Sequence, residues 1–234
     1  MDHKQDPNRQ NSYPMSYIVF DLEWNQPQDG KPTETRKLAF EIIEIGAVKL
    51  NERFNIIDKY DQLIRPQVYH EINWRIKKML DLKRGELSTG RLFPRAASEF
   101  LEWCGEDPVW CTWGSQDLSE LRRNMKFYGM SEMAGDDPIP YINVQRLYGL
   151  HIGNTAQSKA LETAVDELQL PKNVPFHRAY ADAYYTAKVL ACLPDEIRNG
   201  NISYDKPAPP KEHKQGKGGR HAIRRRVRNN KSEL

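Results

Sequence analysis

Two acidic residues at strand spacing are the part of this sequence best suited to chemistry. Asp21 and Glu23 follow an apolar run, 17–20, that is typical of a strand leading out of a protein core. Residues i and i+2 of a strand point to the same face of a sheet, so the two carboxylates should lie side by side. Adjacent carboxylates repel each other unless a cation lies between them, and clusters of oxygen ligands suit Mg²⁺ or Mn²⁺. The pair therefore forms a candidate metal site.

Three later residues could complete such a site: Asp117, His177 and Asp182. Asp117 falls near the start of a predicted helix, where the helix dipole alone favours an acid, so its position fits either a structural or a metal-binding role. His177 and Asp182 are i and i+5, an offset of about 140° on one continuous helix, so they could not both face one site from it. We therefore expect His177 in the loop after Pro175, and Asp182 in the first turns of the next helix.

Apolar periodicity predicts the elements that hold these residues. Three strands come first, at 17–22, 42–50 and 54–64, and together they predict a meander, with a Pro- and Gly-bearing loop at 24–37. Helices then alternate with two short strands, at 109–113 and 141–144. The predicted helices are 72–82, 95–104 (opened by Pro94), 118–128 (with Ser115 as N-cap), 145–150, 158–168 and 178–193 (ended by Pro194). This order of elements predicts an α/β sheet covered by helices.

The composition is that of a soluble globular protein with room for one well-packed domain and an appendage. Of the 234 residues, 38% are hydrophobic and 29% are charged, and no apolar run approaches the ~20 residues of a membrane span. Residues 1–15 are polar and lack the apolar stretch of a signal peptide, so we expect them to be disordered. The cysteines lack Cys-x-x-Cys spacing, which favours reduced, mostly buried thiols in a cytoplasmic protein over a zinc site; they are Cys104, Cys111 and Cys192.

Charge is distributed unevenly along the chain. Residues 206–234 contain ten Lys/Arg and two Asp/Glu, a balance of +8, whereas the whole chain carries +3, which leaves about −5 for residues 1–205. A tail of this basicity favours a polyanionic partner, of which nucleic acid is the commonest, while a merely solubilising tail would have the same composition. The segment after Tyr204 has too few apolar residues to fold alone, so 205–234 is predicted to be a disordered basic tail.

Three sequence signals resemble the exonuclease motifs of the DEDD superfamily, histidine subclass. They are FDLE at 20–23, TWGSQD at 112–117 and HRAYAD at 177–182. The resemblance covers about residues 16–193, in the motif order of that superfamily. Within the superfamily the chain is most similar to the Eri-type exoribonucleases, the group that includes the 3′ histone-mRNA exonuclease, and more distantly to the proofreading subunit of bacterial replicative polymerase. A single Asp-x-Glu often arises by chance, whereas three ordered motifs on the expected elements are specific.

The resemblance implies that residues 16–204 form an RNase H-like α/β fold, a mixed five-stranded sheet flanked by helices. It also implies 3′→5′ hydrolysis of phosphodiesters with two ions, Mg²⁺ or Mn²⁺, about 4 Å apart. One ion would activate the attacking water and the other would stabilise the departing 3′-oxygen. The implied metal ligands are Asp21, Glu23 and Asp182 for the first ion, with Asp21 bridging to the second and Asp117 supporting that second ion through water.

The same resemblance implies roles around the metal site. His177 would be the general base, a task suited to histidine because its side chain titrates near neutrality. The tyrosine subclass would have Tyr where this sequence has Arg178, which favours His177 as the base. Leu22 and Trp24 flank the acid pair and would wedge or stack against the terminal base of the substrate. Trp24 equally fits a cap on the core.

Other residues near the motifs are open to two interpretations. Glu44 is interpreted as a structural acid facing solvent or a neighbouring strand. Arg178, Tyr180 and Lys188 could contact phosphate or lie on a helix surface, and surface positions are favoured for Tyr180 and Lys188. The loop 26–37 should lie beside the site, with an undefined effect on substrate access.

The function favoured by these observations is a 3′→5′ exonuclease acting on RNA that is single-stranded or has a 3′ overhang, with the basic tail contacting phosphates. A DNA exonuclease of the proofreading type is the alternative, because backbone groups can recognise the 2′-hydroxyl that distinguishes the two sugars. A binding module that has lost catalysis would lack at least one carboxylate, and none is missing. No membrane is expected as a partner, and no particular protein partner is indicated.

Overall fold

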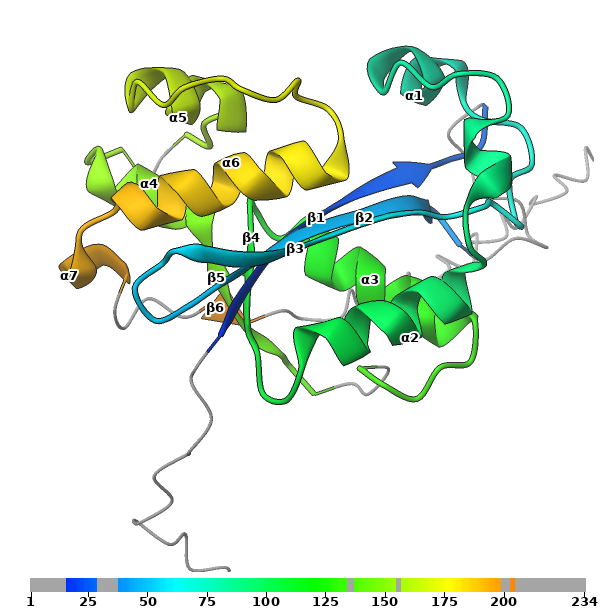
Figure 1. Cartoon of the computed structure of the whole chain (residues 1–234), viewed down its shortest axis with the longest axis horizontal. Coiled ribbons are helices and arrows are strands. Elements are labelled where there is room, and N and C mark those ends of the chain that lie inside the picture. The colour runs from blue at the N-terminus through cyan, green and yellow to red at the C-terminus, as the bar shows by residue number, and fades with distance from the viewer. Residues whose placement is uncertain (1–15, 29–37, 134–136, 155–156, 199–202, 205–234) are drawn as a thin grey trace, which may run out of the picture.

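One mixed β-sheet organises the computed structural model, which describes residues 16–28, 38–133, 137–154, 157–198 and 203–204. The expected N-terminal segment 1–15, residues 29–37 of the predicted loop and the basic tail lie outside the described residues. The strand order is β3-β2-β1-β4-β5-β6 (Figure 1), and the strands are β1 Tyr17–Asn25, β2 Glu41–Leu50, β3 Ile56–Leu63, β4 Val109–Thr112, β5 Pro140–Asn143 and β6 Ser203–Tyr204. The predicted mixed sheet of five strands is confirmed, and the two-residue β6 extends it at one edge.

The first three strands form the predicted meander. β2 pairs with β1 and β3 in antiparallel fashion, whereas β1 pairs with β4, and β4 with β5, in parallel. β1 is longer than predicted because Trp24 and Asn25, assigned to a loop from the sequence, still pair with β2 after a register shift that follows Glu23. The acid pair therefore lies inside a paired strand, not at a free strand end.

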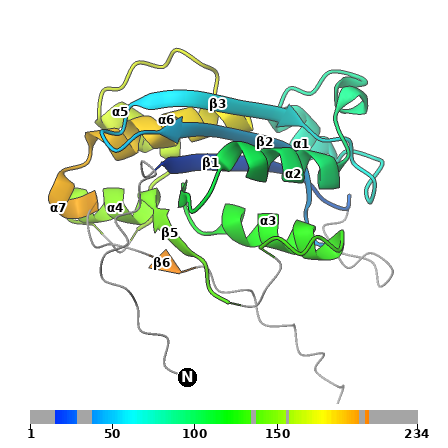
Figure 2. The ribbon, with the colours of Figure 1, turned by 60° about the horizontal axis from the view of Figure 1, so that its bottom comes forward.

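Helices cover both faces of the sheet (Figures 1 and 2). α2 and α3 lie on one face, and α4, α5 and α6 lie on the other. The helices are α1 Trp74–Met79, α2 Phe93–Cys104, α3 Gln116–Phe127, α4 Val144–His151, α5 Leu161–Glu167, α6 Ala179–Cys192 and α7 Asp195–Arg198, with a 3₁₀ helix, η1, at Glu86–Thr89. Within the described part of the chain, no helix is long and apolar enough to cross a membrane.

Alternation along β1 decides which helices each of its residues faces. Ile18 and Phe20 belong to the apolar cluster formed with α2 and α3, whereas Val19 belongs to the cluster formed with α4, α5 and α6. Asp21 and Glu23 have the same parity as Val19, so β1 directs both carboxylates to the face that α6 covers.

Most predicted helices are confirmed to within a few residues, but α1 is much shorter than the predicted helix 72–82. It begins after Asn73, whose side chain accepts a backbone hydrogen bond at the helix N-terminus, and it ends before Asp81, where a φ of 48° turns the chain. Leu80 and Leu82 continue the apolar pattern, yet they pack beneath this turn with Ile43. The short helices η1 and α7 were not predicted.

The predicted N-cap residue and the three cysteines all lie within the described residues. Ser115 is at the N-cap position of α3, as predicted, but its side chain forms no capping hydrogen bond. Cys104 and Cys111 are buried and Cys192 is exposed, and none of the three forms a disulfide with a described residue.

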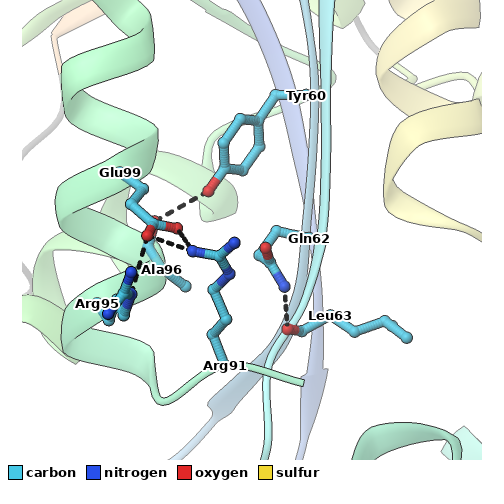
Figure 3. A network of polar contacts seen from close by, with 7 residues as sticks. All are labelled: Tyr60, Gln62, Leu63, Arg91, Arg95, Ala96 and Glu99. Carbon is cyan, nitrogen blue, oxygen red and sulfur yellow. Dashed lines mark hydrogen bonds and ion pairs between the residues drawn. The ribbon is translucent and has the colours of Figure 1, made fainter. Parts of the chain in front are cut away.

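A polar network fastens α2 to the outer part of the sheet (Figure 3). The Tyr60 hydroxyl of β3 donates to the Ala96 carbonyl of α2 at 3.1 Å, and the Glu99 carboxylate pairs with Arg91 just before that helix. The Arg91 carbonyl in turn accepts the N–H of Arg65, just after β3, at 2.8 Å. The long connection that contains α1 and η1 is therefore held to the sheet at both ends.

Gly46 allows α6 to approach the sheet closely at the position that matters for the acid pair. It lies opposite Asp21 in the β1–β2 ladder. A Cβ atom at this position would lie 1.9 Å from the Tyr180 nitrogen and 2.1 Å from the Ala179 carbonyl carbon, both in the backbone of α6. Because only glycine fits, the first turn of α6 rests directly on the sheet beside Asp21.

We expect Gly46→Ala to destabilise the protein strongly. Backbone atoms cannot move aside as a flexible side chain can, so α6 must shift, at a cost of more than about 3 kcal/mol. Gly129→Ala is the matched control: Gly129 has a φ of 71° but nothing within 4 Å of its added Cβ, so only the left-handed backbone cost of about 1 kcal/mol applies. Thermal melting of both variants checks this, and equal losses would contradict the close approach.

Candidate active site

All seven site residues proposed from the sequence line one pocket of about 450 Å³. They come from β1, from the start of α3, and from the loop and first turn of α6; they are Asp21, Leu22, Glu23, Trp24, Asp117, His177 and Asp182. Sequence segments far apart in the chain thus meet at one end of the sheet.

Three carboxylates form the centre of the pocket. Ligand oxygens of Asp21, Glu23 and Asp182 all lie within 4.8 Å of one another. Asp21 and Glu23 share one face of β1, as their spacing predicted, and Asp182 reaches them from the first turn of α6. The close seat of α6 on Gly46 is what brings this third acid to the strand.

Asp117 approaches the same pocket from the first turn of α3 and is only 5% exposed. Its Oδ1 atom accepts a hydrogen bond from the Leu22 backbone N–H at 3.3 Å. This bond fixes the carboxylate against β1, at the residue that separates the two acids of that strand. Asp117 lies outside the group of three acids whose oxygens are within 4.8 Å, which matches a more distant role in the site.

His177 lies in the loop before α6, where the sequence predicted it, with a φ of 66°. Left-handed backbone is uncommon for residues other than glycine, although histidine adopts it more readily than most. Its backbone N–H donates to Asp182 Oδ1 at 3.4 Å, and its exposed side chain lines the pocket. The loop geometry therefore resolves the angular problem that a single helix would have posed.

Burial raises the pKa of all four carboxyl groups in the pocket. It raises the pKa of Glu23 to about 8 and that of Asp117 to about 7, with the neighbouring acids adding to both shifts. Burial and the charges of Asp117, Glu23 and Asp182 raise the pKa of Asp21 well above its usual value, and burial also raises the pKa of Asp182. Without a cation nearby, the protonated form of these carboxyl groups is favoured over the ionised form.

This donor set fits divalent metal ions. Carboxylate oxygens are the ligands that Mg²⁺ and Mn²⁺ prefer, and the described residues that line the pocket include no lysine or arginine that could neutralise the acids instead. Asp21, Glu23 and Asp182 could hold one ion directly, and Asp117 stands beside them to support a second.

We expect the metal-free protein to lose stability as the pH rises. The folded state keeps protons on carboxyls with raised pKa that the unfolded chain releases near pH 4, so this contribution is complete at lower pH and is lost on the way up to about pH 8, the pKa of Glu23. Each ~1 kcal/mol lost should lower Tm by roughly 2–4 °C. Melting curves in EDTA between pH 5 and 8.5 test this.

Two comparisons isolate the cause of that pH dependence. Glu23→Gln removes one titrating group and should flatten the metal-free curve, whereas saturating Mn²⁺ should remove most of the loss in the unaltered protein. A metal-free Tm that rises steadily from pH 5 to 8.5 would show that the raised pKa values are wrong.

Leu22 and Trp24, the two residues expected to contact the terminal base, both line the pocket. Leu22 is buried, and Trp24 also packs partly against the core, with its ring 5.5 Å from that of Phe40. Both alternatives for Trp24 are thus compatible with its place. Residues 113–116 of the second motif also line the pocket, as do Met79 of α1 and Gln145 of α4. No motif marked Met79 and Gln145, because they belong to elements outside the three signals.

Next to the site, the buried Glu44 forms an ion pair with the partly exposed Arg178. Glu44 is 1% exposed, which excludes the solvent-facing alternative and leaves the interpretation as a structural acid within the fold. Arg178 Nε donates to Glu44 Oε2 at 2.9 Å, and its Nη1 atom lies 3.2 Å from Glu86 Oε1. Arg178 is therefore held by two acids directly after His177. Neither Tyr180 nor Lys188 lines the catalytic pocket. Lys188 is exposed, whereas Tyr180 is half-buried against the apolar cluster beneath α6.

Comparison with known proteins agrees with this fold. The family model RNase_T, described as exonuclease, matches residues 18–190. The nuclease domain of 3′hExo, described as a DEDDh family member bound to rAMP, is 20% identical with a TM-score of 0.65, over 83% of this chain and 98% of that one. A 3′-exonuclease that recognises the histone mRNA stem-loop is 19% identical with a TM-score of 0.64, over 85% and 73%.

A more distant structure is that of E. coli exonuclease I in complex with a dA16 oligonucleotide, which is 9% identical with a TM-score of 0.57, over 76% of this chain and 40% of that one. No curated protein sequence gives a significant match. The matched family model covers most of the chain, so the protein belongs to the RNase T exonuclease family. Its fold is similar to that of the 3′hExo nuclease domain, and the description of that protein as a DEDDh family member agrees with the resemblance noted in the sequence.

Proposed function

We propose that this protein is a 3′→5′ exoribonuclease that uses two divalent ions and a histidine general base. The observation that carries the proposal is the cluster of Asp21, Glu23 and Asp182 oxygens within 4.8 Å, in one pocket with Asp117 and His177. Hydrolysis joins a water oxygen to the scissile phosphorus and breaks the bond to the 3′-oxygen. The products are a nucleoside 5′-monophosphate and a strand shortened by one residue.

The ions would activate the attacking water and neutralise charge on the departing oxygen. The residues of the chain hold the ions, move the proton and position the substrate. Asp21, Glu23 and Asp182 would hold the first ion, and Asp21 with Asp117 would support the second. His177, on its loop at the pocket rim, accepts the proton of the water. Leu22 and Trp24 contact the terminal base by apolar packing and stacking.

RNA is proposed as the substrate because two of the similar structures carry RNA or an RNA nucleotide in their descriptions. DNA is the competing substrate, since exonuclease I was described with a DNA oligonucleotide on the same kind of fold. A single experiment separates them: the purified protein with Mg²⁺ or Mn²⁺ is given 5′-labelled RNA and DNA of matched sequence. A ladder shortening from the 3′ end of RNA alone supports the proposal, faster DNA degradation reverses the substrate, and no cleavage of either rejects the function.

The basic segment 206–234 is proposed to bind substrate phosphates, since its charge of +8 opposes about −5 on residues 1–205. Truncation after Tyr204 should weaken binding of long RNA and flatten its salt dependence, because each neutralised phosphate contributes roughly −0.7 to the slope of log K against log salt. Turnover of a trinucleotide should change little. Affinity measured across a salt series, with and without the segment, checks this, and an unchanged slope would assign the tail another role.

A further inference from the structure

Two further pockets adjoin the catalytic pocket and continue it across the surface. The first, of about 570 Å³, shares Met79 and His177 with the catalytic pocket. The second, of about 620 Å³, shares residues 83–86 with the first. Together they form a groove, here called the α1–η1 groove, that leads from His177 past the turn between α1 and η1 to Arg65.

The charge of the lining reverses along this path. The described lining of the catalytic pocket carries four carboxylates and no lysine or arginine. The α1–η1 groove is lined by four exposed cations that form no ion pair with any described residue: Arg65, Lys77, Lys83 and Arg84. Of the three acids in its lining, Glu86 is already bound by Arg178 and by the Lys83 backbone N–H, which leaves Glu71 and Asp81. The groove thus has an excess of free positive charge on a body that is otherwise acidic.

The groove is held at a fixed place relative to the catalytic acids. Asn25, two residues after Glu23, is fully buried, and its side-chain amide donates to the carbonyls of Tyr69 and Glu71 at 3.1 Å. Its Oδ1 atom accepts the N–H of Asn73, the N-cap of α1, at 2.9 Å. The strand that carries the acid pair therefore also positions α1, and Figure 1 shows α1 and the start of α6 near the same end of β1.

The charge of the α1–η1 groove and its position beside the catalytic pocket indicate which kind of ligand it binds. A strand whose 3′-terminal phosphate lies at the carboxylates must leave the pocket carrying one negative charge per nucleotide. The α1–η1 groove offers cations at the surface, and Met79, 46% exposed, offers an apolar side chain between the two regions, against which a base can pack. We propose that the groove binds the phosphates of the nucleotides upstream of the 3′-terminal residue of a single-stranded nucleic acid, an inference that rests on the proposed function.

The double variant Lys83→Gln/Arg84→Gln tests this inference. Both residues are exposed and lie outside the catalytic pocket, so the fold and the chemical step should be unaffected. Binding of a 5′-fluorescein 12-mer RNA, measured by anisotropy with Ca²⁺ in place of Mg²⁺, should weaken about tenfold or more at 50 mM salt. The salt slope should flatten by roughly 0.7 for each phosphate that the variant no longer neutralises. Hydrolysis of a dinucleotide with Mg²⁺ should keep its kcat/KM.

Arg53→Gln/Arg146→Gln is the matched control, because it removes the same charge from two positions outside all three pockets. An equal loss of binding in this control, or unchanged 12-mer binding in the groove variant, would overturn the inference. Failure of the proposed function is recognised separately, as absence of hydrolysis by the unaltered protein with Mg²⁺ or Mn²⁺, and the binding comparison in Ca²⁺ still decides the groove in that case.

Discussion

Asp21→Ala is expected to abolish hydrolysis while leaving the protein folded. Asp21 is the acid that contributes to both proposed ions, and metal ions supply several kcal/mol of transition-state stabilisation, so the rate should fall by more than about 10³-fold. Asp182→Ala should behave in the same way. Turnover of labelled RNA with Mg²⁺ or Mn²⁺ measures the loss.

Stability measurements separate this loss from misfolding. Burial and the neighbouring carboxylates raise the pKa of Asp21, which means that its ionised form is costly in the metal-free fold. The metal-free variant should therefore melt at the same temperature as the unaltered protein or higher, while the rise in Tm on adding Mn²⁺ should largely disappear. Glu52→Ala, which removes an exposed acid outside the pocket, should change neither activity nor the metal response. Substantial turnover by Asp21→Ala would show that this carboxylate is not essential for hydrolysis and would contradict the proposed mechanism.

His177→Ala is expected to lower turnover by about 10²–10⁴, the usual contribution of a general base. The metals should still bind, because His177 is not one of the three clustered ligands. The pH–rate profile should be recorded at saturating metal, so that protonation of Glu23 and Asp117 does not limit the rate. Under those conditions the low-pH limb of the unaltered enzyme should be absent in the variant.

Backbone strain needs its own control, because alanine at a φ of 66° costs about 1 kcal/mol. His177→Asn keeps a residue that accepts left-handed backbone readily but cannot act as the base at neutral pH. Both variants should be equally slow. If asparagine restores activity, the loop conformation and not the imidazole is what matters, and a loss of metal binding in both would make His177 a ligand.

Local patterns explain how much of the site could be predicted from the sequence. The pairing of Asp21 with Glu23 follows from strand alternation, and the displacement of His177 from Asp182 follows from helix geometry, since both are properties of a few consecutive residues. Asp117 became a site residue only through the resemblance of its motif, because an acid in a first helical turn has two explanations. The structure brings all of these residues to one pocket.

Contacts between distant segments account for what was missed. Position 46 must be glycine because the backbone of α6 packs directly against it, and the sequence around Gly46 does not indicate that contact. Asn25 was assigned to a loop, although it ties β1 to α1, and Glu44 was allowed to face solvent, although it is paired with Arg178 134 positions later. α1 is shorter than predicted, and Leu80 and Leu82, which continue its apolar pattern, pack with Ile43 of β2. Periodicity within one segment contains no information about any of these partners.

Because the clustered carboxylates come from β1 and α6, the active site can form only late in synthesis of the chain. Asp21 and Glu23 are translated early, but Asp182 belongs to α6, which follows β1 through β5 and helices α1 to α5. An unfinished chain that lacks α6 has neither the third clustered ligand nor the helix that rests on Gly46. A growing polypeptide therefore cannot assemble the centre before α6 has been made.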